Sequence, residues 1–222
     1  MLKKFVLVVL VLLVGVSILQ VVVVRFMDPP ATMTMAWERA RHWMEEKPHR
    51  PALYIWRDLD EISPHLRRAV MAAEDQRFLF HHGFDFTEIR QAARDVISKR
   101  KIRGASTITM QAARSVFLLP SRSVGRKMVE AYYTVLMECC WDKHRILEIY
   151  LNTVDWGVGI VGAEAAANRY FSCSAAALTP DQAALMTAIL PSPHKWSVKR
   201  PTPYLKARQR RILRHMKAMP LL

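Results

Sequence analysis

The sequence predicts a mostly α-helical domain that follows a single N-terminal membrane-spanning helix. Residues 5–24 form one long apolar run, broken only by Gly15, Ser17 and Gln20. In the rest of the chain, apolar residues recur mainly at helical spacing, and Leu53–Trp56 is the best of few strand candidates. Helix start and stop signals separate these segments. We therefore expect helices to dominate the part of the chain outside the membrane.

The apolar run is predicted to be a membrane anchor. As a helix, residues 5–24 span about 30 Å, the hydrocarbon thickness of a bilayer. Lys3 and Lys4 precede the run, which favours an N-terminus in the cytoplasm. A cleaved signal peptide is the alternative, but its apolar core is about 7–15 residues and ends at a small-x-small site, which residues 25–30 lack. We expect an anchor over 1–27, a juxtamembrane segment over 28–52 and a soluble domain over 53–222.

The juxtamembrane segment contains a predicted amphipathic helix over Met35–Lys47. Trp37 and Trp43 lie in this helix, close to the membrane exit. Tryptophan suits the membrane interface, although packing in a core is an equally open alternative. Pro48 and Pro51 mark the entry to the main domain.

The most informative stretch is Ala69–Gly83. Ser63–Pro64 has the residues of a helix N-terminus, and the predicted helix leads to Glu74 and Asp75. These two carboxylates point roughly 100° apart on a helix, so they occupy different environments. Glu74 follows two alanines beside the apolar stripe, where partial desolvation raises a carboxyl pKa and suits a general base. The alternative is an ordinary helix-end carboxylate beside a cation such as Arg77.

Start and stop signals predict the helices that follow. Asp85 and Glu88 have the spacing of a capping box. Pro120 stops a helix that begins after Gly104, because proline cannot continue the hydrogen-bond ladder. Thr179–Pro180 begins another helix. We expect helices over 85–97, 106–119, 123–141, 143–152, 163–170 and 179–190, followed by a basic segment over 204–219.

The chain is strongly basic, with a formal net charge of +14 and a pI near 10.1. This charge favours an anionic partner, such as nucleic acid, membrane headgroups or a phosphorylated substrate. A domain outside the cytoplasm does not ordinarily meet nucleic acid, and the sequence shows no basic-aromatic RNA-binding motif. We therefore expect no nucleic-acid partner and favour an anionic membrane surface and pyrophosphate.

A second polar cluster follows Gly104, at a predicted helix N-terminus. Its hydroxyls, amide and free backbone N–H groups suit sugar or phosphate oxygens. The polar residues are Ser106, Thr107, Thr109 and Gln111, followed by Arg114, Arg122, Arg126, Lys127 and the second carboxylate, Glu130. The alternative for residues 126–130 is a solvated helix face with an i,i+4 ion pair.

Four motifs occur in order along the chain. They are Glu74–Phe78 with His82 and Gly83, Gly104–Gln111, Arg126–Glu130 and Arg145–Asn152. In this order and spacing, the sequence resembles the peptidoglycan glycosyltransferase family (glycosyltransferase family 51) in its monofunctional, membrane-anchored form. The resemblance covers roughly Leu53–Pro193, with the motif core over 69–193. Four ordered motifs are far more specific than any one of them.

The resemblance implies a lysozyme-like, bilobal helical domain whose small lobe faces the membrane. It also implies a polymerase that joins lipid II to a lipid-linked glycan. Glu74 would deprotonate the 4-hydroxyl of the acceptor GlcNAc, and that oxygen would attack the donor's anomeric carbon, with inversion, to expel undecaprenyl diphosphate. Glu130, the second predicted catalytic residue, would sit at the donor diphosphate, directly or through a divalent metal such as Mg or Mn.

The same resemblance assigns the other predicted site residues. Four cations would hold the diphosphate, namely Arg114, Arg122, Arg126 and Lys127. Ser106 and Gln111 would line the sugar sites, and Asp75, Phe78, His82 and Thr107 complete the predicted substrate-binding set. The chemistry of the residues agrees, because pyrophosphate leaves well once its charge is neutralised and needs cations more than a proton donor.

Two positions depart from the family pattern. Met110 stands where many relatives have glutamine, and Val129 where some have a basic residue, so each removes one expected contact. We expect no transpeptidase domain before Leu222, so cross-linking would require other cell-wall synthesis or division proteins. The expected location is the bacterial inner membrane, with the catalytic domain on the periplasmic side. Two alternatives are a lysozyme-like lytic enzyme and a non-catalytic docking protein of the cell-wall machinery.

Overall fold

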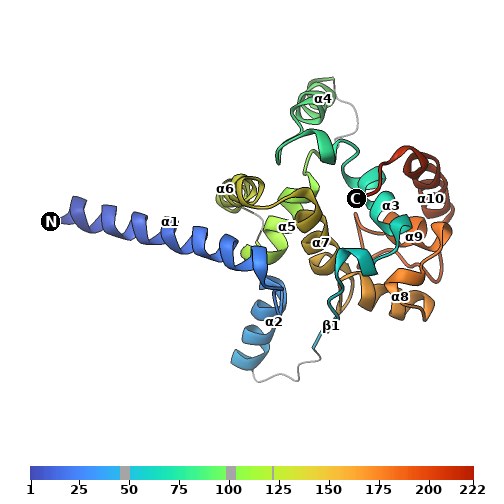
Figure 1. Cartoon of the computed structure of the whole chain (residues 1–222), viewed down its shortest axis with the longest axis horizontal. Helices are drawn as coiled ribbons and strands as arrows, with labels where there is room; N and C mark the ends of the chain where they lie inside the picture. The colour runs from blue at the N-terminus through green and yellow to red at the C-terminus, as the bar shows by residue number, and fades with distance from the viewer. Residues whose placement is uncertain (46–50, 99–103, 122) are drawn as a thin grey trace.

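The computed structural model describes residues 1–45, 51–98, 104–121 and 123–222 of the chain. Helices form most of this part, and α1 (Leu2–Phe26) projects from a body formed by the other elements (Figure 1). Within α1, Lys3–Phe26 is long and apolar enough to cross a membrane, and most of its side chains are exposed. The prediction of a mostly α-helical fold with one N-terminal apolar helix is confirmed.

The C-terminal half of α1 packs on α6 (Val124–Cys140). The Ser17 hydroxyl lies 2.7 Å from the Tyr132 hydroxyl, and the Tyr133 hydroxyl donates to Gln20 Oε1 at 2.6 Å. Two of the polar residues that interrupt the apolar run therefore bind the helical body. A polar group in an apolar environment is costly unless it is hydrogen-bonded, so these contacts also fix how α1 sits on α6.

A single arginine ties the exit of α1 to the body. Arg145 lies in the first turn of α7 (Lys143–Thr153) and donates to the backbone oxygens of Val24 and Met27 at 2.8 and 3.1 Å. It also pairs with Asp28 at 2.8 Å. The fourth sequence motif thus begins with a residue that anchors the chain where it leaves α1.

The juxtamembrane helix α2 (Met33–Met44) begins two residues before its predicted start, because the Thr32 hydroxyl accepts from the backbone N–H of Met35. None of its residues is buried, and Trp43 is 82% exposed. The core-packing alternative for its tryptophans is therefore wrong. Lys47, the predicted end of the helix, lies outside the described residues.

A small three-stranded sheet joins segments that are far apart in the sequence. Its order is β1 (Leu53–Tyr54), β3 (Ile160–Val161) and β2 (Asp155–Gly157). Leu53 pairs in parallel with Ile160, whereas β2 runs antiparallel to β3. The predicted strand is thus present but shorter than Leu53–Trp56. It fixes the start of the soluble domain against the middle of the chain.

Two groups of helices make up the body. In one, α3 (Pro64–Glu74) packs against α9 (Pro180–Ala188) and α10 (Pro203–His215). In the other, α5 (Ile108–Phe117) packs against both α6 and α7. Figure 1 shows α5 and α7 at the centre, with α9 and α10 on the side of the body away from α1. Shorter elements complete the body: α8 (Ala163–Phe171), η1 (Leu59–Glu61), η2 (Phe78–Phe80), η3 (Ala175–Ala177) and η4 (Met216–Ala218).

Helix α4 (Phe86–Ile97) stands apart at the top of Figure 1. Its predicted apolar face is not covered by the described chain, since Val96 is 53% and Ile97 82% exposed. The carboxylate of Asp85 begins the helix by accepting from the backbone N–H groups of Thr87 and Glu88. The capping residue predicted from the sequence therefore acts here as expected.

The later helix boundaries follow the sequence signals closely. The side chains of Thr107, Ser123, Asp142 and Thr179 each accept from a backbone N–H in the first turn of the helix they precede. Such caps satisfy donors that have no partner within the helix. The basic segment predicted over 204–219 corresponds to α10 and η4.

Candidate active site

Glu74 is the last residue of α3, and its carboxylate is held from two other helices. The side-chain amide of Gln111 on α5 donates to Oε2 at 3.2 Å. Nη2 of Arg208 on α10 lies 3.5 Å from Oε1. The Glu74 side chain is only 15% exposed. Three helices that are distant in sequence therefore meet at this carboxylate.

Burial raises the pKa of Glu74 above its ordinary value, because the ionised form loses hydration. The hydrogen bond from Gln111 and the charge of Arg208 lower this pKa and oppose part of the effect. Glu74 does lie at a helix end beside a cation, but this cation is Arg208 and not Arg77, which lies 3.6 Å from Asp85 instead. Glu74 is thus a partly desolvated carboxylate, the state that the sequence predicts for a base.

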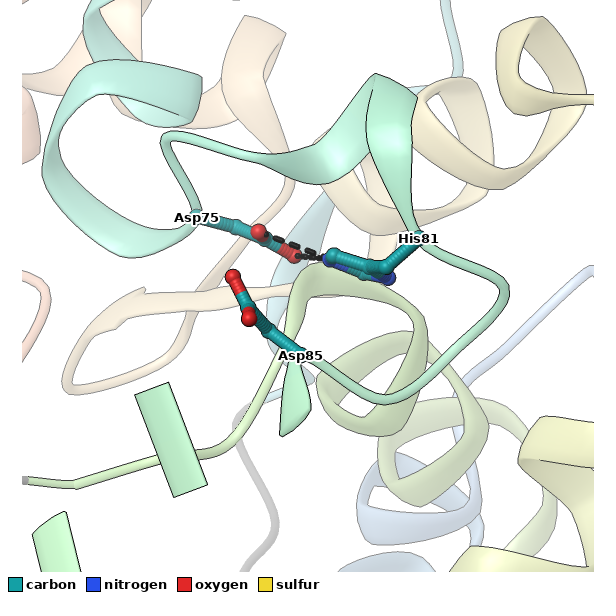
Figure 2. Close-up of side chains that lie close together, drawn as sticks. All are labelled: Asp75, His81 and Asp85. Carbon is teal, nitrogen blue, oxygen red and sulfur yellow. Dashed lines mark hydrogen bonds and ion pairs between the residues drawn. The ribbon is translucent and has the colours of Figure 1, made fainter. Parts of the chain in front are cut away.

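The neighbouring carboxylate, Asp75, faces the protein interior. His81 Nε2 lies 2.9 and 3.1 Å from its two oxygens (Figure 2). The backbone N–H of Ile108 also donates to Oδ2 at 3.1 Å. Ile108 is the first residue of α5, so Asp75 connects the end of α3 to the start of α5. The oxygens of Asp75 thus hold the protein together, and the substrate contact predicted for Asp75 stays a prediction.

Of the two adjacent histidines, the structure buries His81 and not the predicted His82. His81 is 8% exposed, whereas the side chain of His82 is 92% exposed. Phe78 begins the 3₁₀ turn η2, in which positions i and i+3 lie on the same side. Because Phe78 is buried, this spacing turns His81 inward and would have been the sequence signal that distinguishes the two.

Phe78 and Thr107, both predicted to bind substrate, also support the site from within. Phe78 is 1% exposed, and the ammonium of Lys143 lies 4.6 Å from its ring centroid. The Thr107 hydroxyl donates to the carbonyl oxygen of Gly83 at 2.6 Å. Gly83 has φ +84°, and a Cβ there would lie 2.6 Å from Thr134 Cγ2, so no larger residue fits.

The carboxylates of Asp75 and Asp85 and the imidazole of His81 lie within 4.8 Å of one another, close enough to suggest a metal site (Figure 2). At least one ligand atom of each of the three residues is already engaged, however. Both Asp75 oxygens accept N–H bonds, and Asp85 Oδ1 accepts from the first turn of α4. The N-termini of α4 and α5 also carry partial positive charge, which disfavours a cation. This trio is a hydrogen-bonded anchor and does not fit a metal.

The second carboxylate, Glu130, is fully buried on α6. Arg126 Nη1 donates to its Oε2 and Lys127 Nζ to its Oε1. Lys127 Nζ also donates to the Ser106 hydroxyl at 3.1 Å. The alternative of a solvated helix face is wrong for Glu130, because its side chain is 0% exposed. The three residues carry one net positive charge.

Helix α5 connects the two carboxylates. Ser106, just before its N-cap, contacts the Glu130 cluster through Lys127, and Gln111 contacts Glu74. Ser106 lies just before the N-cap Thr107, and Gln111 is the fourth residue of α5, so both lie near the N-terminal end of this helix. The structure therefore brings together Glu74, Gln111, Ser106 and the Glu130 cluster around one helix, as the predicted constellation requires.

The remaining predicted cations differ in position. Arg114 is exposed on α5, three residues after Gln111, and its charge lowers the pKa of Glu74. Arg122 lies outside the described residues. Of the two departures from the family pattern, Met110 is 6% exposed and Val129 is 44% exposed. Arg208 contacts Glu74 but was not predicted, because α10 lies beyond the four motifs in the sequence.

A family model described as Transglycosylase matches residues 43–217, which is most of the chain. The chain belongs to the transglycosylase family. It is 45% identical over 212 residues to the biosynthetic peptidoglycan transglycosylase of Caulobacter vibrioides, a match that covers 96% of this chain and 90% of the relative. For the protein of that name from Shewanella oneidensis the identity is 46% over 203 residues, covering 91% and 86%. The one from Xylella fastidiosa is 43% identical over 203 residues, covering 91% and 84%.

In this transglycosylase, the first motif divides into two functions. Glu74 is the member whose carboxylate meets α5 and α10, whereas Asp75, Phe78 and the neighbouring His81 hold the turn that follows it. The arrangement therefore offers a desolvated base at one end of the first turn of α5 and a cation cluster at the other. Such a pair of centres can take up a proton and stabilise a developing negative charge.

Proposed function

We propose that this chain polymerises the glycan strands of peptidoglycan. It would transfer a lipid-linked glycan chain to the GlcNAc 4-hydroxyl of lipid II and release undecaprenyl diphosphate. Membership of the transglycosylase family and the names of its relatives support the reaction class. The single observation that carries the assignment of residues is the desolvated Glu74 carboxylate, held by Gln111 on the helix that also meets the Glu130 cluster.

In the proposed reaction, Glu74 accepts the proton of the acceptor hydroxyl. The freed oxygen forms a bond to the anomeric carbon of the donor while the bond from that carbon to the phosphate oxygen breaks. The electron pair of the broken bond stays on the diphosphate. Burial makes Glu74 a stronger base than an exposed carboxylate, and Gln111 orients it toward the proton.

The departing diphosphate requires positive charge. Arg126 and Lys127 provide it next to Glu130, with Arg114 as a further exposed cation; Arg122 is assigned here from the sequence alone. Glu130 holds the two cations in a fixed geometry and leaves one net positive charge on the cluster. Cations that are oriented in advance stabilise developing charge more effectively than mobile ones.

A divalent metal at Glu130 fits these residues poorly. Each carboxylate oxygen already accepts a bond from a cation, so a metal would have to displace Arg126 or Lys127. Mg²⁺ also prefers several oxygen ligands in octahedral geometry, and Glu130 supplies the one carboxylate of this cluster. The Mg or Mn expected from the resemblance stays a prediction.

The proposed location is the bacterial inner membrane, with α1 spanning it and the catalytic domain on the periplasmic side. The apolar helix and the lysines before it support this orientation. Lipid II and the lipid-linked glycan would enter from the membrane, and the basic surface suits anionic headgroups. Other cell-wall synthesis or division proteins would cross-link the strands.

A lysozyme-like lytic activity is the second candidate, because a raised carboxyl pKa also suits a general acid. The guanidinium 3.5 Å from Glu74 argues against it, since it favours the ionised base. The cation cluster at Glu130 has no obvious task in glycan hydrolysis, where the leaving group is a sugar alcohol.

The deciding experiment incubates the purified full chain with labelled lipid II and sizes the product, with and without chelator. We expect long glycan in both conditions, absent from Glu74→Gln and retained by Glu61→Gln, a control in the exposed end of η1. Release of fragments from purified sacculi, without polymer from lipid II, would favour the lytic candidate. Dependence of the polymer on added Mg²⁺ or Mn²⁺ would support the metal prediction.

A further inference from the structure

The C-terminal part of the chain concentrates the positive charge. Residues 182–222 contain nine lysines and arginines and no aspartate or glutamate. Eight of the nine are exposed: Lys195, Lys199, Arg200, Lys206, Arg210, Arg211, Arg214 and Lys217. The ninth, Arg208, has a side chain that is 14% exposed. A guanidinium that turns inward from such a surface must be compensated by a partner.

The position of Arg208 on α10 explains why it turns inward. Leu205, Ile212 and Met216 are 0%, 3% and 4% exposed, and together with Arg208 they follow the i, i+3/i+4 spacing of one helix face. Helix α10 packs on α3 and α9 and is drawn near them in Figure 1. Arg208 is thus a charged residue within an otherwise apolar contact, aimed at the end of α3.

The partner of Arg208 is Glu74. Nη2 of the guanidinium lies 3.5 Å from Oε1, the oxygen that Gln111 does not use. The two donors come from different helices and engage different oxygens, so together they limit rotation of the carboxylate. Among the described residues, Glu74 is the only carboxylate within ion-pair distance of this guanidinium, and Nε of Arg208 is buried without a hydrogen-bond partner.

Other charged or titratable groups also face Glu74. Asp75 follows it in the chain, Arg114 approaches from α5, and the Tyr150 hydroxyl from α7 is fully buried within its electrostatic reach. His215, at the end of α10, hydrogen-bonds Gln76 at 2.9 Å. The charged residues of α9 and η4, Asp181 and Lys217, are exposed.

We propose that Arg208 is a positioning residue for Glu74: it holds the base in its working orientation and balances the negative charge that burial makes costly. The inference rests on the proposed function of Glu74. It assigns to α10, which lies outside the four motifs, a direct influence on the base. Arg208 acts through Glu74 and takes no proton itself, because a guanidinium stays protonated at any working pH.

The charge relationship predicts a specific pH signature. Removing Arg208 removes a group that lowers the pKa of Glu74, so this pKa rises further and the base stays protonated to a higher pH. The acid limb of the pH profile therefore moves upward, and part of the activity returns at alkaline pH. An arginine that only covered α3 would lose activity equally at every pH.

The test measures kcat/KM for lipid II against pH in Arg208→Gln, Arg208→Lys and Arg210→Gln, an exposed control on the same helix. For Arg208→Gln we expect about a 10-fold loss near neutral pH and an acid midpoint above the parental one. Lysine retains the positive charge but lacks the planar guanidinium group. Arg208→Lys should therefore keep the parental acid midpoint while its kcat/KM is lower. His215→Asn tests whether that histidine sets the midpoint.

An unchanged acid midpoint in Arg208→Gln, or the same shift in Arg210→Gln, overturns the inference. Melting temperatures provide a readout that needs no activity. If Arg208 compensates Glu74, then Glu74→Gln should restore the melting temperature that Arg208→Gln loses, including the case in which Arg208→Gln alone does not fold. Absence of this rescue also overturns the inference. Lack of polymer from the parent would instead contradict the proposed function.

Discussion

Glu74 and Glu130 are both shielded from solvent, but their surroundings differ. Glu74 has one amide and one guanidinium at 3.2 and 3.5 Å, both from distant helices, and burial raises its pKa. Glu130 is completely buried, and both of its oxygens are bound by cations from its own helix. The first carboxylate is weakly compensated, whereas the second is the centre of a cation cluster.

The comparison shows how a buried glutamate side chain can perform either of two tasks. A weakly compensated carboxylate gains from accepting a proton, which is what a base must do. A carboxylate whose two oxygens are both paired with cations is not stabilised by protonation, and it instead holds those cations in fixed positions. The number and geometry of the partners, and not burial alone, separate the two roles. The following predictions test this contrast, beginning with the largest expected effect.

Glu74→Gln should lower the rate of lipid II polymerisation about 10²–10⁴-fold, the usual contribution of a positioned base. It should lower the melting temperature at neutral pH only a little, because removing a charge that burial disfavours offsets the loss of the partner of Arg208. Product sizing and thermal melting check the two parts. Parental activity in this variant would remove Glu74 from its role, and a large loss of stability would contradict the weak compensation.

Glu130→Gln should show the opposite balance, with a marked loss of stability as well as activity. Arg126 and Lys127 would lose the charge that holds them together. The cost should be below the about 3–5 kcal/mol typical of a broken buried ion pair, because the Lys127 side chain is 43% exposed. Thermal melting beside Glu61→Gln measures it. Equal melting temperatures of Glu130→Gln and the parent would contradict the proposed contrast between Glu130 and Glu74.

The two adjacent histidines form a matched pair of variants. His81→Ala should destabilise the protein by about 1–3 kcal/mol, because it leaves the buried Asp75 carboxylate short of a donor. His82→Ala should change stability by no more than about 0.5 kcal/mol, as is usual at an exposed position. Melting of both variants decides the matter. A larger effect from His82 would mean that the buried anchor beside Glu74 has been misassigned.

The pH dependence of the parent should reveal Glu74 through its acid limb. The folded-state pKa lies above the ordinary value of about 4.5, so activity is present above this raised pKa and is lost as pH falls through it. The ionised carboxylate also reduces stability at neutral pH, and this cost disappears as the pH falls. A profile of kcat/KM against pH checks the midpoint, which must lie above 4.5; a midpoint at or below that value would contradict the desolvated base.

Much of the fold could be predicted because its signals are local. Ser63, Asp85, Ser123, Asp142 and Thr179 cap the helices that the sequence assigned to them. Their effect depends only on backbone groups two or three residues away. The apolar spacing of each helix is local in the same sense, so helix type and approximate length could be derived without knowing the topology.

The site was predicted less completely, because partners are not local. Gln111 contacts Glu74, and Ser106 contacts the Glu130 cluster, whereas Asp75 and Thr107 bind the protein itself; the predicted roles of these residues stay predictions. The sequence does not show that Asp75 faces α5, which begins 33 residues later. Choosing between His81 and His82 required knowing that a 3₁₀ turn begins at Phe78.

From the sequence alone we could derive the apolar N-terminal helix, the order of the helices, the excess of positive charge and the identity of two candidate carboxylates. The packing of the helices was needed to show what each carboxylate contacts and that α2 leaves its tryptophans exposed. It also showed that Arg208, of the nine lysines and arginines in residues 182–222, is the one that turns inward to Glu74. The difference follows from the range of the interactions involved. Periodicity and capping depend on neighbours along the chain, whereas burial and ion pairing depend on which helices pack together.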